Sequence, residues 1–326
     1  MPSLKTTALA LLAATATAMP ATIRLSSRQM QYHALTKRQQ ENAQQSGLSD
    51  FDILQFALTL ENLEETFYRQ GFAKFPESDF AALGLDKQQI TDLQQIGKTE
   101  AEHVGLLQSS LAQGGVKPVQ PCEYEFGFTN AAGMVQTAAV LENIGVSAYL
   151  AAAPLLSDKA ILSTAGSILT VEARHQSSIR VFSKQVAVPQ AFDAPLGPRA
   201  VFSLAAPFIK SCPEGSNLKI EAFPKLAMMA GASGGNGTSS GALAVGSNFK
   251  VQADGNTGSE ATNCAFTSGG VFPGGTAFSN FTQAEGCQVP QGVAGITYVT
   301  LTKSAPLTGV LTDDMIVAGP MAVAIS

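Results

Sequence analysis

Four segments between residues 49 and 184 carry apolar residues at alternating spacings of three and four, the period of one face of an α-helix. Ser49, with Asp52 three residues later, is typical of a capping box. The predicted helices span about residues 49–71, 87–112, 130–153 and, capped by Ser157, 157–184. Residues 114–129 have no helical period and are long enough to cross a bundle. The pattern predicts a four-helix bundle with a long crossover.

Two of the predicted apolar faces contain a glutamate and a histidine three residues apart, Glu100 with His103 and Glu172 with His175. At this spacing both side chains leave the same face of a helix. One such pair is explained by a core histidine that is satisfied by a neighbouring acid. The chain repeats the pair, however, and uses two of its three histidines for it. The repetition favours a metal site.

The other two helices each carry a glutamate followed seven residues later by a tyrosine, Glu61 with Tyr68 and Glu142 with Tyr149. Seven residues are two helical turns, so each pair shares a face, and the arrangement looks like an internal duplication. Four inward glutamates and two histidines form the ligand set of di-iron and di-manganese carboxylate bundles. The predicted ligands are Glu61, Glu100, His103, Glu142, Glu172 and His175.

Charge balance supports two metal ions, because four carboxylates carry about −4 and two divalent cations offset it. Without metal, the acids would have to take up protons. Tyr68 and Tyr149 either hydrogen-bond the carboxylates from outside the ligand set or simply pack in the core. Glu64 and Glu65 have no acidic counterpart in the third helix, so we expect them on a solvated face.

Three segments resemble a known family: residues 56–64, 140–149 and 168–176. They are similar to the ferritin-like domain proteins of fungi, among them secreted stress-response proteins, with plant desiccation-related proteins as distant relatives. The resemblance covers residues 49–184. It implies a ferritin-like four-helix bundle in which Glu100 and Glu172 bridge two metal ions. The remaining ligands would complete the two coordination spheres in pairs, Glu61 with His103 and Glu142 with His175.

After Cys212 the composition changes to Gly, Ser, Thr and Asn, with apolar residues alternating with polar ones. This predicts a small, sandwich-like all-β domain over residues 211–326, after a helical domain over residues 46–210 that ends with a short helix from residue 199. Residues 231–238 lack the ending of a phosphate-binding loop and are expected to be a flexible loop. The predicted strands are 218–223, 248–253, 264–267, 277–282, 296–302 and 315–325.

The first residues predict export. Residues 1–21 are typical of a secretory signal peptide, and residues 22–38 end in a dibasic pair that resembles a kexin-type maturation site, so they are expected to be a propeptide. Asn236 and Asn280 lie in glycosylation sequons. The four cysteines fit an oxidising compartment and allow three pairings, of which we favour Cys122–Cys212 and Cys264–Cys287. We therefore expect a secreted glycoprotein.

Composition and histidine count exclude several functions. The net charge of −5 leaves no basic stripe for nucleic acid, and no apolar run of about twenty residues predicts a membrane span. If His33 is lost with the propeptide, every imidazole belongs to the predicted metal site. Ser-His-Asp or Cys-His hydrolysis needs a free imidazole and is therefore disfavoured.

Two functions fit the sequence. The first is a secreted protein with a di-iron centre, in which manganese could replace iron, that reacts with oxygen or peroxide. The second is a non-catalytic extracellular stress or cell-wall-associated protein, in which the metal only ties the helices together. An appended glycosylated domain makes an iron-storage cage awkward.

Overall fold

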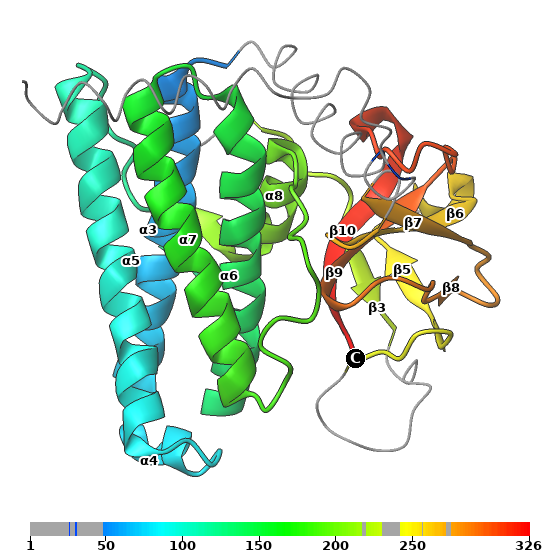
Figure 1. Ribbon diagram of the computed structural model, residues 1–326, viewed down its shortest axis with the longest axis horizontal. Helices are drawn as coiled ribbons and strands as arrows, with labels where there is room; N and C mark the ends of the chain where they lie inside the picture. The colour runs from blue at the N-terminus through cyan, green and yellow to red at the C-terminus, as the bar shows by residue number, and fades with distance from the viewer. Residues whose placement is uncertain are drawn as a thin grey trace, which may run out of the picture.

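The structure, a computed structural model, describes residues 26, 30, 48–216, 220–229, 242–255, 257–271 and 275–326. The predicted signal peptide, nearly all of the predicted propeptide, the sequon at Asn236 and the predicted loop 231–238 lie outside these residues. Figure 1 shows a helical region at one side of the molecule and a β-rich region at the other.

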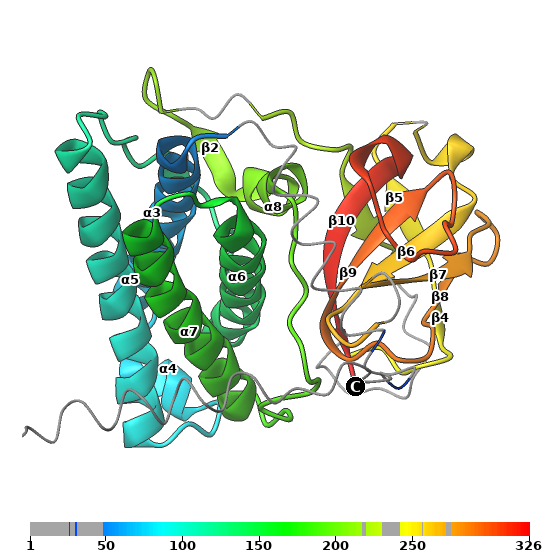
Figure 2. The ribbon, with the colours of Figure 1, turned by 45° about the horizontal axis from the view of Figure 1, so that its top comes forward.

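Four long helices lie side by side and form the helical region (Figures 1 and 2). Helix α3 packs mainly on α5, and α6 packs mainly on α7. All four predicted helices are present, with ends shifted by at most three residues. A short helix that the sequence analysis missed, α4, lies between the first two. The bounds are α3 Asp50–Lys74, α4 Glu77–Ala81, α5 Lys87–Gln113, α6 Ala131–Ala152 and α7 Lys159–Phe182.

The helix starts follow local capping chemistry. Ser49 and Asp52 form the predicted capping box of α3. The cap of α7 differs from the prediction, because Asp158 and not Ser157 accepts the first backbone N–H groups. The N–H group of Ser157 instead donates to the carboxylate of Asp50, at 2.9 Å. This bond ties the start of α7 to the start of α3.

Helix α6 is the one described helix that is long and apolar enough to span a membrane by length and composition. Half of its most apolar window is buried inside the protein, and it contains the fully buried Glu142. Its apolar residues, including Met134, Leu141 and Ile144, belong to the helical core. A helix in the centre of a helical domain has this character.

The β-rich region is antiparallel. Its main sheet has the order β10-β9-β6-β7, and two smaller pairs, β3 with β5 and β4 with β8, accompany it. In the helical region, β1 pairs with β2. The bounds are β1 Glu123–Tyr124, β2 Ile209–Ser211, β3 Leu226–Met228, β4 Asn248–Phe249, β5 Val251–Ala253, β6 Asn263–Thr267, β7 Thr276–Asn280, β8 Cys287–Gln288, β9 Gly295–Thr302 and β10 Ile316–Ile325.

Two strand predictions were wrong. The described part of 218–223, residues 220–223, is not a strand. The Glu221 carbonyl accepts from Arg199, and the Phe223 N–H donates to Ser203, so its polar groups bond to a helix and not to a sheet. The segment 248–253 is two strands, β4 and β5, which pair with different partners.

The two regions meet at α8, Pro198–Ala205, which lies beside α6 and contacts β10 (Figure 2). At the same junction, the Tyr298 side chain of β9 reaches α6. Its hydroxyl donates to the Asn143 carbonyl at 2.9 Å and also bonds the side chains of Asn143 and Ser147. Asn143 follows Glu142 directly, so the sheet supports the helix turn that carries a predicted ligand.

Two disulfides link Cys122 to Cys212 and Cys264 to Cys287, the pairs that the sequence analysis favoured. The first joins the segment between α5 and α6 to the segment after α8, next to the β1–β2 pair. The second joins β6 to β8 inside the core of the β-rich region. Disulfides are typical of oxidising compartments.

Candidate metal centre

The structure brings all six predicted ligands into one buried cluster. Their carboxylate and imidazole groups form two overlapping sets, in each of which four ligand atoms lie within 4.8 Å of one another. Glu100 and Glu172 belong to both sets. The first set adds Glu61 and His103, and the second adds Glu142 and His175.

Each of the four long helices contributes one glutamate, and each of these glutamates is 0% exposed. The two imidazoles are 8% exposed at His103 and 6% exposed at His175, and their ring centroids are 6.1 Å apart. Both sit on the helices that also carry the shared glutamates, α5 and α7. The three-residue spacing puts each imidazole beside the glutamate of the previous turn.

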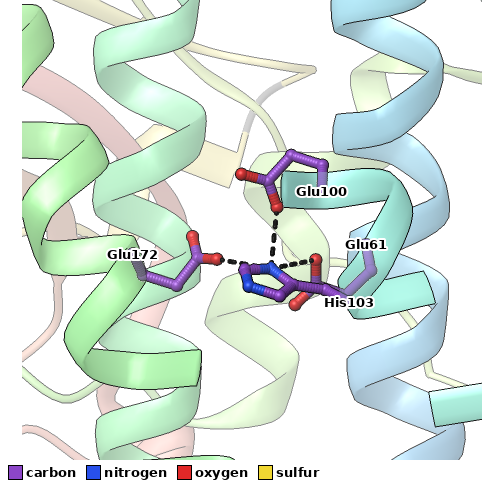
Figure 3. A group of neighbouring side chains, drawn as sticks. All are labelled: Glu61, Glu100, His103 and Glu172. Carbon is purple, nitrogen blue, oxygen red and sulfur yellow. Dashed lines mark hydrogen bonds and ion pairs between the residues drawn. The ribbon is translucent and has the colours of Figure 1, made fainter. Parts of the chain in front are cut away.

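The Nδ1 atom of His103 faces three carboxylates (Figure 3). The distances are 3.1 Å to Glu100 Oε2, 3.2 Å to Glu172 Oε1 and 3.3 Å to Glu61 Oε2. A ring nitrogen carries at most one hydrogen, so it cannot satisfy three acceptors. The cluster therefore presents more negative oxygens than its own donors can serve.

His175 is held in one orientation by a residue that the sequence analysis missed. Thr99 Oγ1 donates to the carbonyl of Ile96 at 2.7 Å, so its lone pair is free to accept from His175 Nε2 at 2.9 Å. Once Nδ1 has given up its proton, the neutral imidazole keeps its hydrogen on Nε2 and presents a bare Nδ1. That Nδ1 lies 2.7 Å from Glu100 Oε1 and 3.2 Å from Glu142 Oε2. Only the position of Thr99 next to Glu100 could have suggested this role.

Tyr68 and Tyr149 hydrogen-bond the cluster, and they do so crosswise. The Tyr68 hydroxyl on α3 donates to Glu142 on α6, and the Tyr149 hydroxyl on α6 donates to Glu61 on α3 at 2.6 Å. Each tyrosine therefore hydrogen-bonds the glutamate of the other repeat and not the glutamate on its own helix. The exchange agrees with the internal duplication that the sequence suggested, and it favours the first of the two roles considered for these tyrosines.

Glu64 corrects a prediction. We expected it on a solvated face with Glu65, but Glu64 is only 4% exposed, whereas Glu65 is partly exposed and pairs with Arg69 at 2.8 Å. Glu64 faces Gly145, where a Cβ atom would lie 3.3 Å from Glu64 Oε1 and 2.6 Å from Glu172 Oε2. The glycine opposite Glu64 in the repeat thus leaves the space that the acid needs. The glycine at the matching position of the repeat is the one sequence signal of this complementarity.

Burial and repulsion between carboxylates raise the pKa values of Glu64, Glu100 and Glu172. The pKa of Glu64 and that of Glu172 are raised well above the usual range, by burial first and by the neighbouring carboxylates second. The pKa of Glu100 is raised to about 7 by burial and by Glu142, although contacts with the two imidazoles oppose the shift. A group of like charges in a dry site favours the protonated acids.

The pKa values of the two imidazoles are also raised, but here the neighbouring carboxylates raise them and burial opposes the shift. Burial acts to lower the pKa of His103, but its carboxylate neighbours outweigh burial and raise the pKa to about 12. The same balance, with Glu100 and Glu142 as the neighbours, raises the pKa of His175 to about 10. In the metal-free chain, protons therefore supply the positive charge that the cluster requires.

The donor set fits divalent metal ions. Among the described residues, the buried oxygens Glu61 Oε2, Glu100 Oε1 and Glu172 Oε1 have no contact within the protein except a shared imidazole Nδ1, at 2.7 to 3.3 Å, and Glu172 Oε2 has no hydrogen-bond partner. Such groups are costly unless something compensates them. Carboxylate and imidazole ligands suit iron and manganese, and a shared pair of carboxylates suits two adjacent ions.

The fold and the site agree with a protein class. Residues 49–185 match the model of the family described as "Ferritin-like domain". The helical region is therefore ferritin-like, and it holds a buried carboxylate and histidine cluster that can bind metal.

Similarity also extends to individual proteins. Protein rds1 of Schizosaccharomyces pombe is 28% identical over 181 residues, which are 55% of this chain and 44% of that protein, so the chain spans less than half of this relative. The crystal structure of a conserved hypothetical protein from Mycobacterium tuberculosis aligns with a TM-score of 0.34 and 21% identity, over 43% of this chain and 94% of that one.

Proposed function

We propose that the helical region binds two divalent metal ions, most readily iron, and that the protein is a secreted di-metal oxidoreductase. The observation that supports this most is the pair of overlapping ligand sets that share Glu100 and Glu172. These two carboxylates would bridge the ions. Glu61 with His103 and Glu142 with His175 would complete the two coordination spheres. A di-iron centre of this kind supplies electron transfer to dioxygen or peroxide.

The chain's own residues prepare the site for this chemistry. Thr99 fixes the His175 ring so that Nδ1 faces the carboxylates. Tyr68 and Tyr149 donate to Glu142 and Glu61, which orients one oxygen of each carboxylate and leaves the other for a metal ion. Both hydroxyls keep their protons at neutral pH, because burial and the adjacent carboxylate raise the tyrosine pKa well above its usual value.

The remaining parts of the proposal concern architecture and location. The two helix pairs, α3 with α5 and α6 with α7, support a four-helix bundle whose crossover is the segment from residue 114 to residue 130. We divide the chain into a helical domain, residues 46–210, and a β domain, residues 211–326. Two disulfides support export, as does Asn280, which is exposed at the end of β7 and accessible to glycosylation.

Metal counting tests the proposal. The purified chain should hold about two ions after reconstitution with ferrous iron, and the double variant Glu172→Ala, His175→Ala should hold fewer than about one. Arg174→Ala is the matched control, because Arg174 lies between the two ligands on α7 but is exposed. Fewer than about one ion in the wild-type chain would contradict the site.

A second measurement separates catalysis from a structural role. The iron-loaded protein should consume dioxygen or peroxide and give a ferric optical spectrum, and Arg174→Ala should behave in the same way. If the ions bind, and their removal unfolds the helices, but neither oxidant is consumed, the centre is structural. The protein would then be a non-catalytic extracellular one whose metal ties the helices together.

A further inference from the structure

A cavity of about 260 Å³ lies inside the helical region, at the end where α3 and α7 begin and α5 and α6 end. It is larger than the engineered cavity of roughly 150 Å³ that stays dry and binds benzene, and slightly smaller than the roughly 300 Å³ at which drug-sized pockets begin. Its size fits a short chain or a single ring.

The cavity wall is apolar and lacks charge. Its lining consists of aliphatic and aromatic side chains with three polar ones, Ser110, Gln113 and Thr164, apart from the tyrosine discussed next. Small side chains in the lining leave the cavity volume open, among them Ala57, Ala148, Ala152 and Ala165. Since the lining offers no charged partner, an ionised ligand group would lose its hydration without compensation.

The inner end of the cavity adjoins the metal cluster. Tyr149 lines the cavity with its ring while its hydroxyl donates to Glu61 at 2.6 Å. Leu107 lies one turn beyond His103, and Ile168 lies one turn before Glu172, which is about 5.4 Å along each helix. Both residues are buried. A molecule that fills the cavity therefore ends about one helical turn from the ligands.

The outer end is accessible and mildly polar. Gln113 and Ala160, which line the cavity, are exposed. The hydroxyls of Ser110 and Thr164 donate to backbone carbonyls of their own helices, at 2.9 Å and 3.0 Å. Their lone pairs remain available, so the outer end can accept a hydrogen bond from a ligand.

We propose that this cavity binds a short apolar chain with a neutral hydroxyl at its outer end, such as an aliphatic alcohol, and presents the other end of the chain to the metal centre. This names a substrate class for the proposed function and depends on that function for its purpose. The binding itself does not need the metal. The apolar wall supplies affinity through the area removed from water, and the hydroxyl lone pairs set the orientation.

Calorimetry with n-octanol and n-octanoate tests the binding. We expect saturable binding of n-octanol with a negative heat-capacity change, and binding of n-octanoate that is at least about tenfold weaker, because the Ser110 and Thr164 hydroxyls already donate to carbonyls and cannot donate to its carboxylate. Ala152→Leu should weaken n-octanol binding at least about tenfold by filling the cavity. Ala151→Leu is the matched control, because this neighbour on α6 does not line the cavity. Ala165→Leu fills the same space from α7 and serves if Ala152→Leu fails to fold.

Loading the metal site with Co²⁺ tests whether a molecule in the cavity reaches the metal centre. We expect n-octanol to change the visible spectrum of the Co²⁺ protein in the wild type and in Ala151→Leu, and to leave it unchanged in Ala152→Leu. The proposal would be wrong if n-octanol showed no saturable binding, or if Ala151→Leu weakened n-octanol binding as much as Ala152→Leu does. Binding without any spectral change would overturn the link to the centre. If Co²⁺ fails to bind while n-octanol still does, the proposed function fails and the cavity assignment stands.

Discussion

The helical and β-rich regions bury different kinds of side chain. Among the described residues, every buried ionisable glutamate, histidine and arginine lies on the four long helices. The buried polar groups of the β-rich region are hydroxyls of Ser and Thr, such as Thr267, Thr297 and Thr300. Its core packs Phe249 and Phe266 around the disulfide of Cys264 and Cys287.

The difference shows where the protein gives up stability for chemistry. Hydrogen-bonded hydroxyls and apolar side chains can be buried at little cost, whereas clustered carboxylates are costly until something compensates their charge. The β-rich region is built like an ordinary protein core. The helical region has its unfavourable groups at one level of the four helices, which is what a site prepared for cations requires.

The largest expected effect follows removal of the metal ions, and it should separate the two regions. At free metal of about 1,000 times the dissociation constant, each ion adds about 4 kcal/mol to the free energy of unfolding. Chelation should therefore speed hydrogen exchange in α3, α5, α6 and α7 and leave β6, β9 and β10 unchanged. Equal loss of protection in both regions would mean that they unfold as one unit.

The pH dependence of the metal-free protein sharpens the same contrast. Glu64, Glu100, Glu172, His103 and His175 all have raised pKa values, so the folded chain binds more protons than the unfolded chain. The stabilisation that these groups give the folded chain is fully present below the unfolded carboxyl pKa, near 4.5. It falls as pH rises, by about 1.4 kcal/mol per pH unit for each extra proton. The loss continues through the folded pKa of Glu100, about 7, and towards those of the histidines.

Urea unfolding of the metal-free chain between pH 5 and pH 8, followed by circular dichroism, measures this slope. Metal-loaded protein should show the reverse trend over the same range, since its ligands must be deprotonated to bind. A metal-free protein whose stability rises with pH would contradict the protonated cluster.

Substitution of Gly145 should affect the centre specifically. A Cβ atom there would lie 2.6 Å from Glu172 Oε2, so Gly145→Ala must displace a proposed bridging carboxylate. We expect the metal affinity to fall about tenfold to a hundredfold, or about 1.4 to 2.8 kcal/mol. Gly105→Ala is the control, because no atom lies within 4 Å of its Cβ position, and it should stabilise α5 by up to about 1 kcal/mol. Calorimetric titration with Mn²⁺ distinguishes the two, and unchanged affinity in Gly145→Ala would show that Glu172 is not a ligand in this position.

The smallest expected effect concerns Glu64. Glu64→Gln removes one ionisable acid from the buried cluster, so the metal-free protein should gain about 1 kcal/mol at pH 8 while the metal count stays the same. Glu65→Gln is the matched control on the next residue and should change stability by less than about 0.5 kcal/mol, because its pair with Arg69 is partly exposed. Loss of metal in Glu64→Gln would make Glu64 a seventh ligand.

Much of the helical region could be predicted, because helix periodicity places Glu61, Glu100, Glu142 and Glu172 on inward faces without knowledge of the neighbours. The prediction for Glu64 was wrong because it rested on the absence of an acidic counterpart in the repeat. That absence does not place Glu64 in solvent, since the space above Gly145 on α6 admits it to the core. The predicted strand at 218–223 failed because alternation cannot reveal that its backbone groups bond to α8.

The amino-acid sequence by itself determined the four helices, their inward faces and the set of six acids and imidazoles, since the period of a helix and the cost of buried charge act locally. Only the tertiary structure decided the crosswise bonds of Tyr68 and Tyr149, the Thr99 contact that orients His175, and the apolar cavity beside Glu61. These features depend on which helices become neighbours and on how far apart they lie. Packing across the whole chain sets those distances, and no short stretch of sequence contains them.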